Sequence, residues 1–86
     1  MSVFLDLDPD AWVASNELAF AIRDGFPVSP GHTLVVPRPV ISDWWQAPPD
    51  LRLAMFELVD DVKRRLDVEF APNGYNVGFN AGAAAG

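Results

Sequence analysis

The chain has 86 residues, of which half are hydrophobic and none is cysteine, and its formal net charge is −6. A chain of this length makes one small domain, and the lack of cysteine excludes disulfide bonds and cysteine-based zinc sites. Nucleic acids and anionic membranes are bound by clustered Lys and Arg, so the acidic balance and the absence of any basic run argue against both as partners.

A short helical start and two strands are predicted in the first quarter of the chain. Asp8 can cap a helix whose first position is Pro9, because the N–H that proline lacks has no partner there. Residues 12–15 are compatible with a short strand. Over residues 18–23 apolar side chains alternate with small or polar ones, which is typical of a half-buried strand. The apolar face of that strand carries Leu18, Phe20 and Ile22.

A loop and a further strand follow. Pro, Ser and Gly are concentrated in residues 24–31, where they predict a stiff loop. Residues 32–36 are rich in β-branched side chains, which favours a strand, and Pro37 ends it. The adjacent tryptophans Trp44 and Trp45 come next. Two interpretations stay open: both cap the core, or one covers the helix and the other marks a partner surface.

The longest predicted element is an amphipathic helix that opens with Pro48, Pro49 and Asp50. Its apolar residues recur at steps of three or four and its charged residues take the other faces, which predicts about five turns. Residues 71–74 have turn composition and end the helix. A last strand is expected over residues 75–80. The helix stripe consists of Leu51, Met55, Leu58, Val62 and Leu66, and the strand face of Tyr75, Val77 and Phe79.

The order of the main elements is strand, strand, helix, strand, with connections compatible with antiparallel pairing. This order predicts an α+β fold in which the long helix packs across one face of a mainly antiparallel sheet. The sequence contains no repeat and no linker, so residues 1–86 are expected to form a single domain.

Two stretches carry a family resemblance. Residues 16–37 read NELAFAIRDGFPVSPGHTLVVP, and residues 75–86 read YNVGFNAGAAAG. In this order, separated by one amphipathic helix, they resemble the histidine triad (HIT) family of nucleotide-binding hydrolases and transferases. The resemblance implies the same α+β fold, completed by a further strand bearing His-x-His-x-His, and a homodimer. The chain stops before that motif and its one histidine is His32, so we expect an incomplete HIT-like domain without the triad strand.

The resemblance gives nucleotide-binding roles to two polar residues around the loop. Asp24 stands eight residues before His32, and in the family the aspartate at that spacing accepts both hydroxyls of a ribose. Without the resemblance, Asp24 is an ordinary turn-forming residue. His32 corresponds to the family's histidine beside the triad, which is auxiliary and not the nucleophile. Spacing alone favours a histidine at the edge of a strand.

Four further residues receive binding roles from the same resemblance. Phe4 and Ile22 match positions that line the base pocket, where apolar walls hold a purine. Asn80 matches a residue that reaches the ribose or the phosphate. The small-residue loop that ends at Gly86 resembles a loop whose N–H groups approach the phosphate. Considered alone, these residues are typical of a core or of a strand end, and Phe20 is expected to be core.

Two functions follow as expectations. In the first, the chain is part of a hydrolase of nucleotide phosphoramidates or dinucleoside polyphosphates, or of a nucleotidyl transferase. This chain alone is then predicted to be inactive, because the covalent step needs the nucleophile of the triad. In the second, it is a catalytically dead remnant that acts as a dimerisation or protein-interaction module. The sequence leaves the leaving group open.

The expected ligand is a purine nucleotide or nucleoside phosphate, and the resemblance requires no cofactor or metal. Homodimerisation or self-association is expected. No apolar run reaches the length of a membrane-spanning helix, and the start MSVFLD lacks the basic region of a secretory signal. These features predict a cytoplasmic protein.

Overall fold

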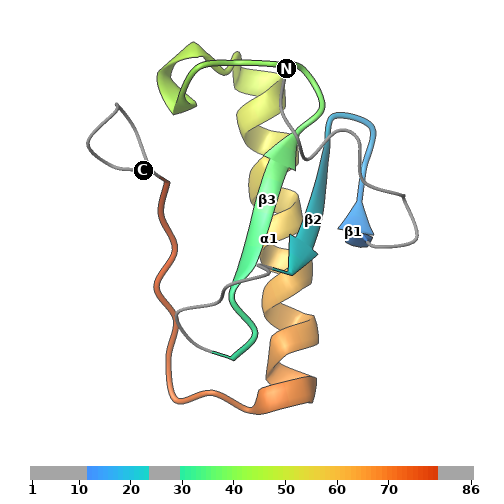
Figure 1. The fold of residues 1–86 in the computed structure, drawn as a ribbon, viewed down its shortest axis with the longest axis vertical. Coiled ribbons are helices and arrows are strands. Elements are labelled where there is room, and N and C mark those ends of the chain that lie inside the picture. The colour runs from blue at the N-terminus through green and yellow to red at the C-terminus, as the bar shows by residue number, and fades with distance from the viewer. Residues whose placement is uncertain (1–11, 24–29, 80–86) are drawn as a thin grey trace.

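The computed structural model describes residues 12–23 and 30–79, and residues 1–11, 24–29 and 80–86 lie outside this description. Its elements follow one another along the chain as three strands, a short 3-10 helix and one long helix (Figure 1). They are β1 (Trp12–Ser15), β2 (Ala19–Arg23), β3 (Thr33–Pro37), η3 (Trp44–Gln46) and α1 (Pro49–Phe70). The helical start predicted around Asp8 lies outside the described residues.

The strands form one antiparallel sheet in the order β1-β2-β3. The turn between β1 and β2 is built by Asn16, whose side-chain oxygen accepts hydrogen bonds from the N–H groups of Leu18 (3.1 Å) and Ala19 (3.0 Å). Such an Asx turn reproduces a backbone turn with a side chain. The amide of Asn16 also donates to the carbonyl oxygen of Ala54 at 2.8 Å, and this bond ties the hairpin to α1.

β2 is the central strand, and its two faces have different partners. Ala19 and Ala21 face α1 and pack with Leu58 and Val62 in one buried cluster. Because alanine is small, the helix can lie close to the strand at this point. Figure 1 shows α1 running behind the sheet, so the predicted packing of the helix on one sheet face is confirmed.

The opposite face of β2 carries the larger side chains. Phe20 is fully buried and Ile22 is 5% exposed, and both cluster with Val36 of β3. The ring of Trp12 stacks on Phe20 with centroids 4.4 Å apart. The predicted common face of Phe20 and Ile22 is therefore confirmed, and so is the expectation that Phe20 is a core residue. The strand is not half-buried as predicted, because Ala19 and Ala21 on its other face are fully buried too.

α1 contains 22 residues, about one turn more than the sequence pattern predicted. Proline stands at its first position, where no N–H is needed. Its C-terminal cap is Ala71, whose left-handed backbone (φ 47°) ends the helix where turn chemistry was expected. The buried helix residues are Leu51, Ala54, Leu58 and Val62.

The predicted strand over residues 75–80 is wrong for its described part, because residues 75–79 adopt no strand. Figure 1 shows segment 71–79 on the side of β3 away from β2, as an extended chain. Tyr75 and Phe79 anchor the segment through side chains, to α1 and to η3 respectively. A strand requires a ladder of backbone hydrogen bonds, and none joins residues 72–79 to β3 among the described residues.

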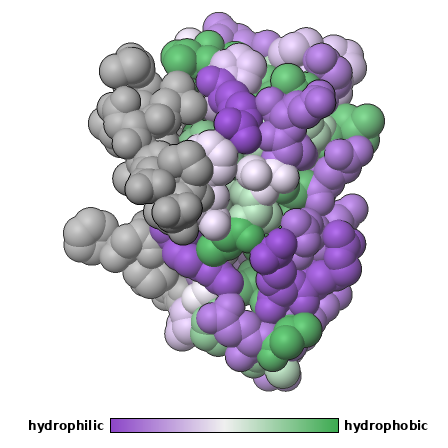
Figure 2. All heavy atoms as spheres, turned by 90° about the vertical axis from the view of Figure 1, so that its right-hand side faces the viewer, coloured by the Kyte–Doolittle hydropathy of each residue, from purple (hydrophilic) through white to green (hydrophobic). Residues whose placement is uncertain are grey.

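The surface seen in Figure 2 is mostly hydrophilic, with small hydrophobic areas between the polar side chains. The solvent side of α1 carries several ion pairs one turn apart, such as Lys63 with Asp67 at 2.8 Å and Arg65 with Asp61 at 3.3 Å. In the part of the chain that the structure describes, no helix is long and apolar enough to cross a membrane.

Candidate functional site

The candidate site is built on the turn that leads into β3. Pro30 and Gly31 form the turn, and His32 follows directly before the first residue of the strand. Gly31 has φ 83°, a conformation that residues with a side chain rarely adopt. A β-carbon at Gly31 would lie 2.8 Å from Cε2 of Phe70, so the turn also needs glycine for its close approach to the end of α1.

Arg23, the last residue of β2, holds this turn with its guanidinium group. Nη1 donates to the carbonyl oxygen of Gly31 at 3.2 Å and to Oγ1 of Thr33 at 3.2 Å. Nη2 donates to Oε2 of Glu69 at 2.7 Å. The guanidinium also lies 5.9 Å from the centre of the Phe70 ring. One side chain therefore joins the end of β2, the turn before β3 and the last turn of α1.

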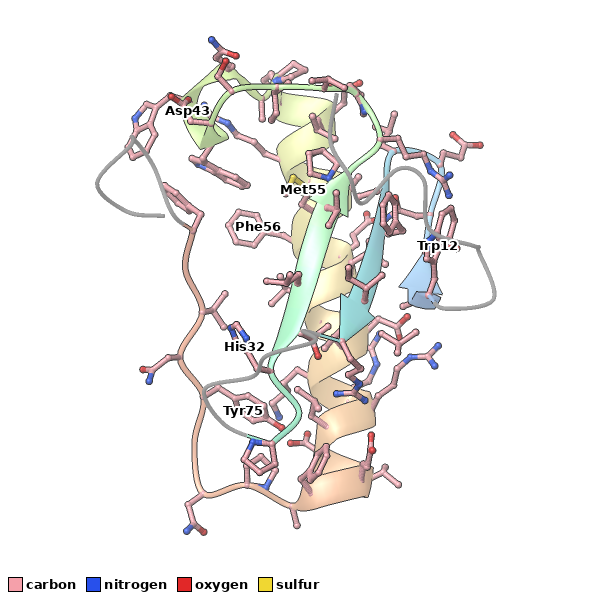
Figure 3. All side chains as sticks on the ribbon, viewed as in Figure 1. Trp12, His32, Asp43, Met55, Phe56 and Tyr75 are labelled. Carbon is pink, nitrogen blue, oxygen red and sulfur yellow. The ribbon has the colours of Figure 1, made fainter. Side chains whose placement is uncertain are left out.

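His32 is half-buried and stands next to this network. In Figure 3 its imidazole projects to the side of β3 on which segment 71–79 runs. The ladder pairs Arg23 with Thr33, so His32 adjoins the last rung between β2 and β3. The structure thus puts the predicted histidine beside the end of the sheet ladder. This agrees with the general interpretation, and the role that the family resemblance gives to His32 stays a prediction.

Ile22 lies in the apolar layer on the sheet face opposite α1, together with Leu34 and Val36 of β3. Ile22 is 5% exposed, which is the burial of a core residue. Its role in lining a base pocket stays a prediction. The other four predicted binding residues, Phe4, Asp24, Asn80 and Gly86, lie outside the described residues. Their binding roles stay predictions.

Two open hollows lie away from His32 and Ile22. The larger, ≈340 Å³, lies between the β1–β2 turn and the start of α1, and the smaller, ≈160 Å³, between the end of β3 and segment 71–79. Neither is lined by the predicted binding residues that the structure describes, so we do not assign the nucleotide to them. The smaller hollow is lined by Pro37, Ile41, Asp43, Trp44, Met55 and Phe79.

The two adjacent tryptophans have different environments. Trp44 packs against Phe56 of α1 with ring centroids 5.3 Å apart, and Phe79 stacks on it at 5.1 Å. Trp45 is 66% exposed and meets Phe79 edge-on. Of the two sequence interpretations, the structure favours the one in which one tryptophan covers the helix and the other projects outward.

Tyr75 and Asp67 form a second polar contact at the side of α1. The hydroxyl group of Tyr75 donates to Oδ1 of Asp67 at 2.5 Å, and Lys63 donates to the other carboxylate oxygen at 2.8 Å. Hydrogen bonds from Lys63 and Tyr75 hold the pKa of Asp67 below its usual value. Partial desolvation, with the bond to Asp67, raises the pKa of Tyr75 to about 12.

Sequence reasoning missed Arg23, Glu69 and Phe70 as part of the candidate site. Arg23 and Glu69 are 46 positions apart, and no local pattern links residues at that separation. The signal that was present is the position of Arg23 directly before Asp24 in the family-like stretch. Over residues 12–23 and 30–79, no group of His, Asp or Glu residues is arranged to hold a metal ion.

Comparison with known proteins identifies the family. The family model described as HIT domain matches residues 6–86, so the chain belongs to the HIT family. The crystal structure of a HIT family member from Bacillus subtilis superimposes with a TM-score of 0.85 at 32% identity, covering 98% of this chain and 62% of that one. The α+β arrangement of a three-stranded antiparallel sheet and one long helix therefore matches the corresponding part of a solved member of this family.

Relatives by sequence include proteins of known and unknown activity. An uncharacterised HIT-like protein of Mycoplasma pneumoniae is 36% identical over 74 residues, which cover 86% of this chain and 51% of the relative. An AP-4-A phosphorylase of Mycobacterium tuberculosis is 33% identical over 75 residues, covering 86% of this chain and 38% of the relative. The chain thus spans about half the length of the curated relatives it matches.

Proposed function

We propose that this chain is the nucleotide-binding portion of a HIT-family hydrolase or transferase and that its ligand is a purine nucleoside phosphate. The observation that carries the proposal is the ladder between β2 and β3, in which Arg23 pairs with Thr33. Asp24 directly follows Arg23, and His32 directly precedes Thr33. The two polar residues to which the family resemblance gives a ribose-binding and an auxiliary role are therefore the chain neighbours of one paired rung.

The chemistry of this site is binding rather than turnover. In the family, the central histidine of the triad attacks the α-phosphate and forms a nucleotidyl intermediate, which water then hydrolyses. The 86 residues hold one histidine, His32, and a single imidazole cannot serve both as nucleophile and as the group that orients it. The AP-4-A phosphorylase among the relatives supports a nucleotide ligand. A cytoplasmic location fits this chemistry and stays part of the proposal.

In the binding experiment the purified chain is titrated with AMP, and the affinity is measured by calorimetry. Asp24→Asn should weaken AMP binding about tenfold, because a hydrogen bond to a charged group contributes about 1.5 kcal/mol. The 2′- and 3′-deoxy forms of AMP should show the same loss with the unchanged chain and no further loss with Asp24→Asn. Asp60→Asn, on the exposed side of α1, is the control with the same change of charge. Absence of AMP binding at millimolar concentration would refute the proposal.

The activity experiment uses a fluorogenic adenosine phosphoramidate. We expect no turnover from the chain, and any trace that persists in His32→Ala would come from a contaminating enzyme or from a nucleophile other than histidine. Repeated purification to constant activity distinguishes the two. Constant turnover by the purified chain would contradict the proposal that it binds without chemistry.

A second candidate function, dimerisation or protein interaction, is favoured by one observation. Trp45, Phe56 and Phe79 are each more than half exposed, and they lie in one aromatic cluster around Trp44. Exposed aromatic clusters are typical of interaction surfaces. This function and nucleotide binding use different parts of the chain and are compatible with each other.

A further inference from the structure

We propose that Arg23 is a positioning residue for His32, and that its guanidinium group sets the direction in which the imidazole leaves the start of β3. The consequence for nucleotide affinity rests on the proposed function, whereas the consequence for His32 itself does not. Arg23 has no role in the resemblance from which the binding residues were predicted. Its role follows from four contacts of one side chain.

The first step is the contact between Arg23 and the peptide unit of His32. The carbonyl group of Gly31 and the N–H of His32 belong to the same peptide bond, which is planar. Two donors hold the carbonyl oxygen: Nη1 of Arg23 at 3.2 Å and the hydroxyl group of Thr33 at 2.8 Å. Holding that oxygen fixes the plane of the peptide, and with it the direction of the N–Cα bond of His32, from which the side chain starts.

The second step is the freedom that this contact removes. Gly31 has no side chain and lies at φ 83°, and glycine explores a wider range of backbone conformations than any other residue. The bond from Arg23 limits this freedom at the peptide between Gly31 and His32, because Arg23 starts from β2, whose last rung pairs it with Thr33.

The third step is the brace that orients Arg23. The carboxylate of Glu69 holds Nη2 at 2.7 Å, and the Phe70 ring lies 5.9 Å from the guanidinium carbon. The planar fork of arginine can serve an acceptor at each tip, which a lysine ammonium cannot reproduce. The last turn of α1 thereby fixes the guanidinium plane, and the guanidinium fixes the peptide before His32.

The small energy of the Arg23–Glu69 ion pair favours a positioning role for Arg23 over a stabilising one. The side chains of Arg23 and Glu69 are 32% and 54% exposed, and ion pairs at such exposure contribute about 0–1 kcal/mol. A stabilising function alone would need only the two opposite charges. The additional bonds to Gly31 and Thr33 are those that a positioning function requires.

The test uses the single histidine of the chain. Because His32 is the only one, its imidazole proton signals in an NMR spectrum need no assignment by mutation. Arg23→Lys keeps the charge and loses the fork, so the ring and amide signals of His32 should shift and AMP affinity should fall about fivefold. Arg64→Lys is the control, since Arg64 is exposed and its ion pair with Asp61 is long, at 3.9 Å.

A charge exchange separates positioning from ion pairing. The double variant Arg23→Glu/Glu69→Arg restores two opposite charges, but glutamate cannot donate to the carbonyl oxygen of Gly31. We expect it to recover thermal stability relative to Arg23→Glu and to leave the His32 signals displaced. Thr33→Val, which keeps a β-branched strand residue and removes the second donor, should displace the same signals.

The outcomes are distinct. If the double variant restores the His32 signals, Arg23 acts only as an ion-pair partner and the inference is overturned. Unchanged His32 signals in both Arg23→Lys and Thr33→Val overturn it as well, even where Arg23→Glu fails to fold. If the unmodified chain does not bind AMP while Arg23→Lys and Thr33→Val displace the His32 signals, the proposed function fails and the positioning role stands.

Discussion

At the scale of single residues, the site needs glycine at position 31, where a side chain would not fit. Its backbone is left-handed, and the space where a β-carbon would lie is filled by Phe70 and Leu66. Gly31→Ala should lower the free energy of unfolding by about 2 kcal/mol, because left-handed strain and overpacking add. Urea denaturation measures this. Gly78→Ala is the matched control, since nothing lies within 4 Å there, and equal losses in both variants would contradict the account.

The contact between Tyr75 and Asp67, which anchors segment 71–79, should contribute stability only between two pH limits. The folded pKa of Asp67 is lowered below 3.8, so its stabilising contribution is complete above the unfolded value and is lost as the pH falls through the folded one. The folded pKa of Tyr75 is raised from 10.0 to about 12. Its contribution is therefore complete below pH 10 and is lost as the pH rises through about 12.

The same pair gives a direct titration experiment. Tyr75 is the one tyrosine of the chain, so the ultraviolet absorbance of the ionised phenol reports its titration without interference from another tyrosine. Asp67→Asn should lower the pKa of Tyr75 only part of the way from about 12 towards 10.0, because desolvation, the largest cause of the shift, remains while the carboxylate that opposes the tyrosinate charge is removed. Asp60→Asn should leave the midpoint where it is. A midpoint near 10 in the unmodified chain would exclude the contact.

At the scale of elements, the C-terminus of α1 is held by an unfavourable residue. Ala71 adopts φ 47°, and its N–H bonds to the carbonyl oxygen of Asp67 at 3.2 Å. Glycine is the usual residue at such a cap. Ala71→Gly should raise the free energy of unfolding by about 0.5–1 kcal/mol, the left-handed strain relieved minus the entropy that glycine adds to the unfolded chain. Thermal and urea unfolding measure the change.

A second glycine variant tests whether the position of the glycine decides if the free energy of unfolding rises or falls. Arg64→Gly places glycine inside α1, where it should destabilise by about 1 kcal/mol. Opposite signs for the two glycine substitutions are expected. If both destabilise, Ala71 does not carry the strain that its backbone angle indicates.

Periodicity predicted the elements whose partners are local in the sequence. The stripe that includes Leu58 and Val62 predicted α1, and the alternation around Phe20 predicted both faces of β2. The strand expected over residues 75–80 failed in its described part because alternation predicts side-chain faces but not whether a neighbouring strand accepts the backbone. Tyr75 reaches α1 instead.

The candidate site shows the same limit. A motif of consecutive residues predicted His32 and Asp24, whereas the support of His32 depends on Arg23 meeting Glu69 across 46 positions. Such a contact follows from how α1 crosses the sheet, and the length of the helix decides it. The sequence predicted the end of the helix correctly, at the turn residues that begin with Ala71. It did not show which residue of the sheet the last turn of the helix would meet.

At the scale of the whole molecule, the sheet and one aromatic cluster predict self-association. β3 is an edge strand, and among the described residues its outer side has no ladder partner. An open edge is a template for pairing with another chain. Segment 71–79 runs on the same side of β3 (Figure 1). In that segment Phe79 contacts Trp45 and Trp44, Trp44 in turn contacts Phe56, and Val77 is 65% exposed.

Sedimentation velocity at rising micromolar concentration should therefore show association of the chain with itself. Phe56→Lys removes an aromatic ring that is 52% exposed and should shift the equilibrium towards monomer, because apolar contact area is replaced by repelling charge. Val68→Lys is the matched control: Val68 is 89% exposed on the last turns of α1 and outside the aromatic cluster.

A domain of this size has little stability in reserve. Because association stabilises the folded chain by mass action, its melting temperature should rise with protein concentration. A clean monomer with a cooperative melt at an ordinary mesophile temperature would show that the described sheet is complete as it stands, and the edge of β3 would then be no interaction surface.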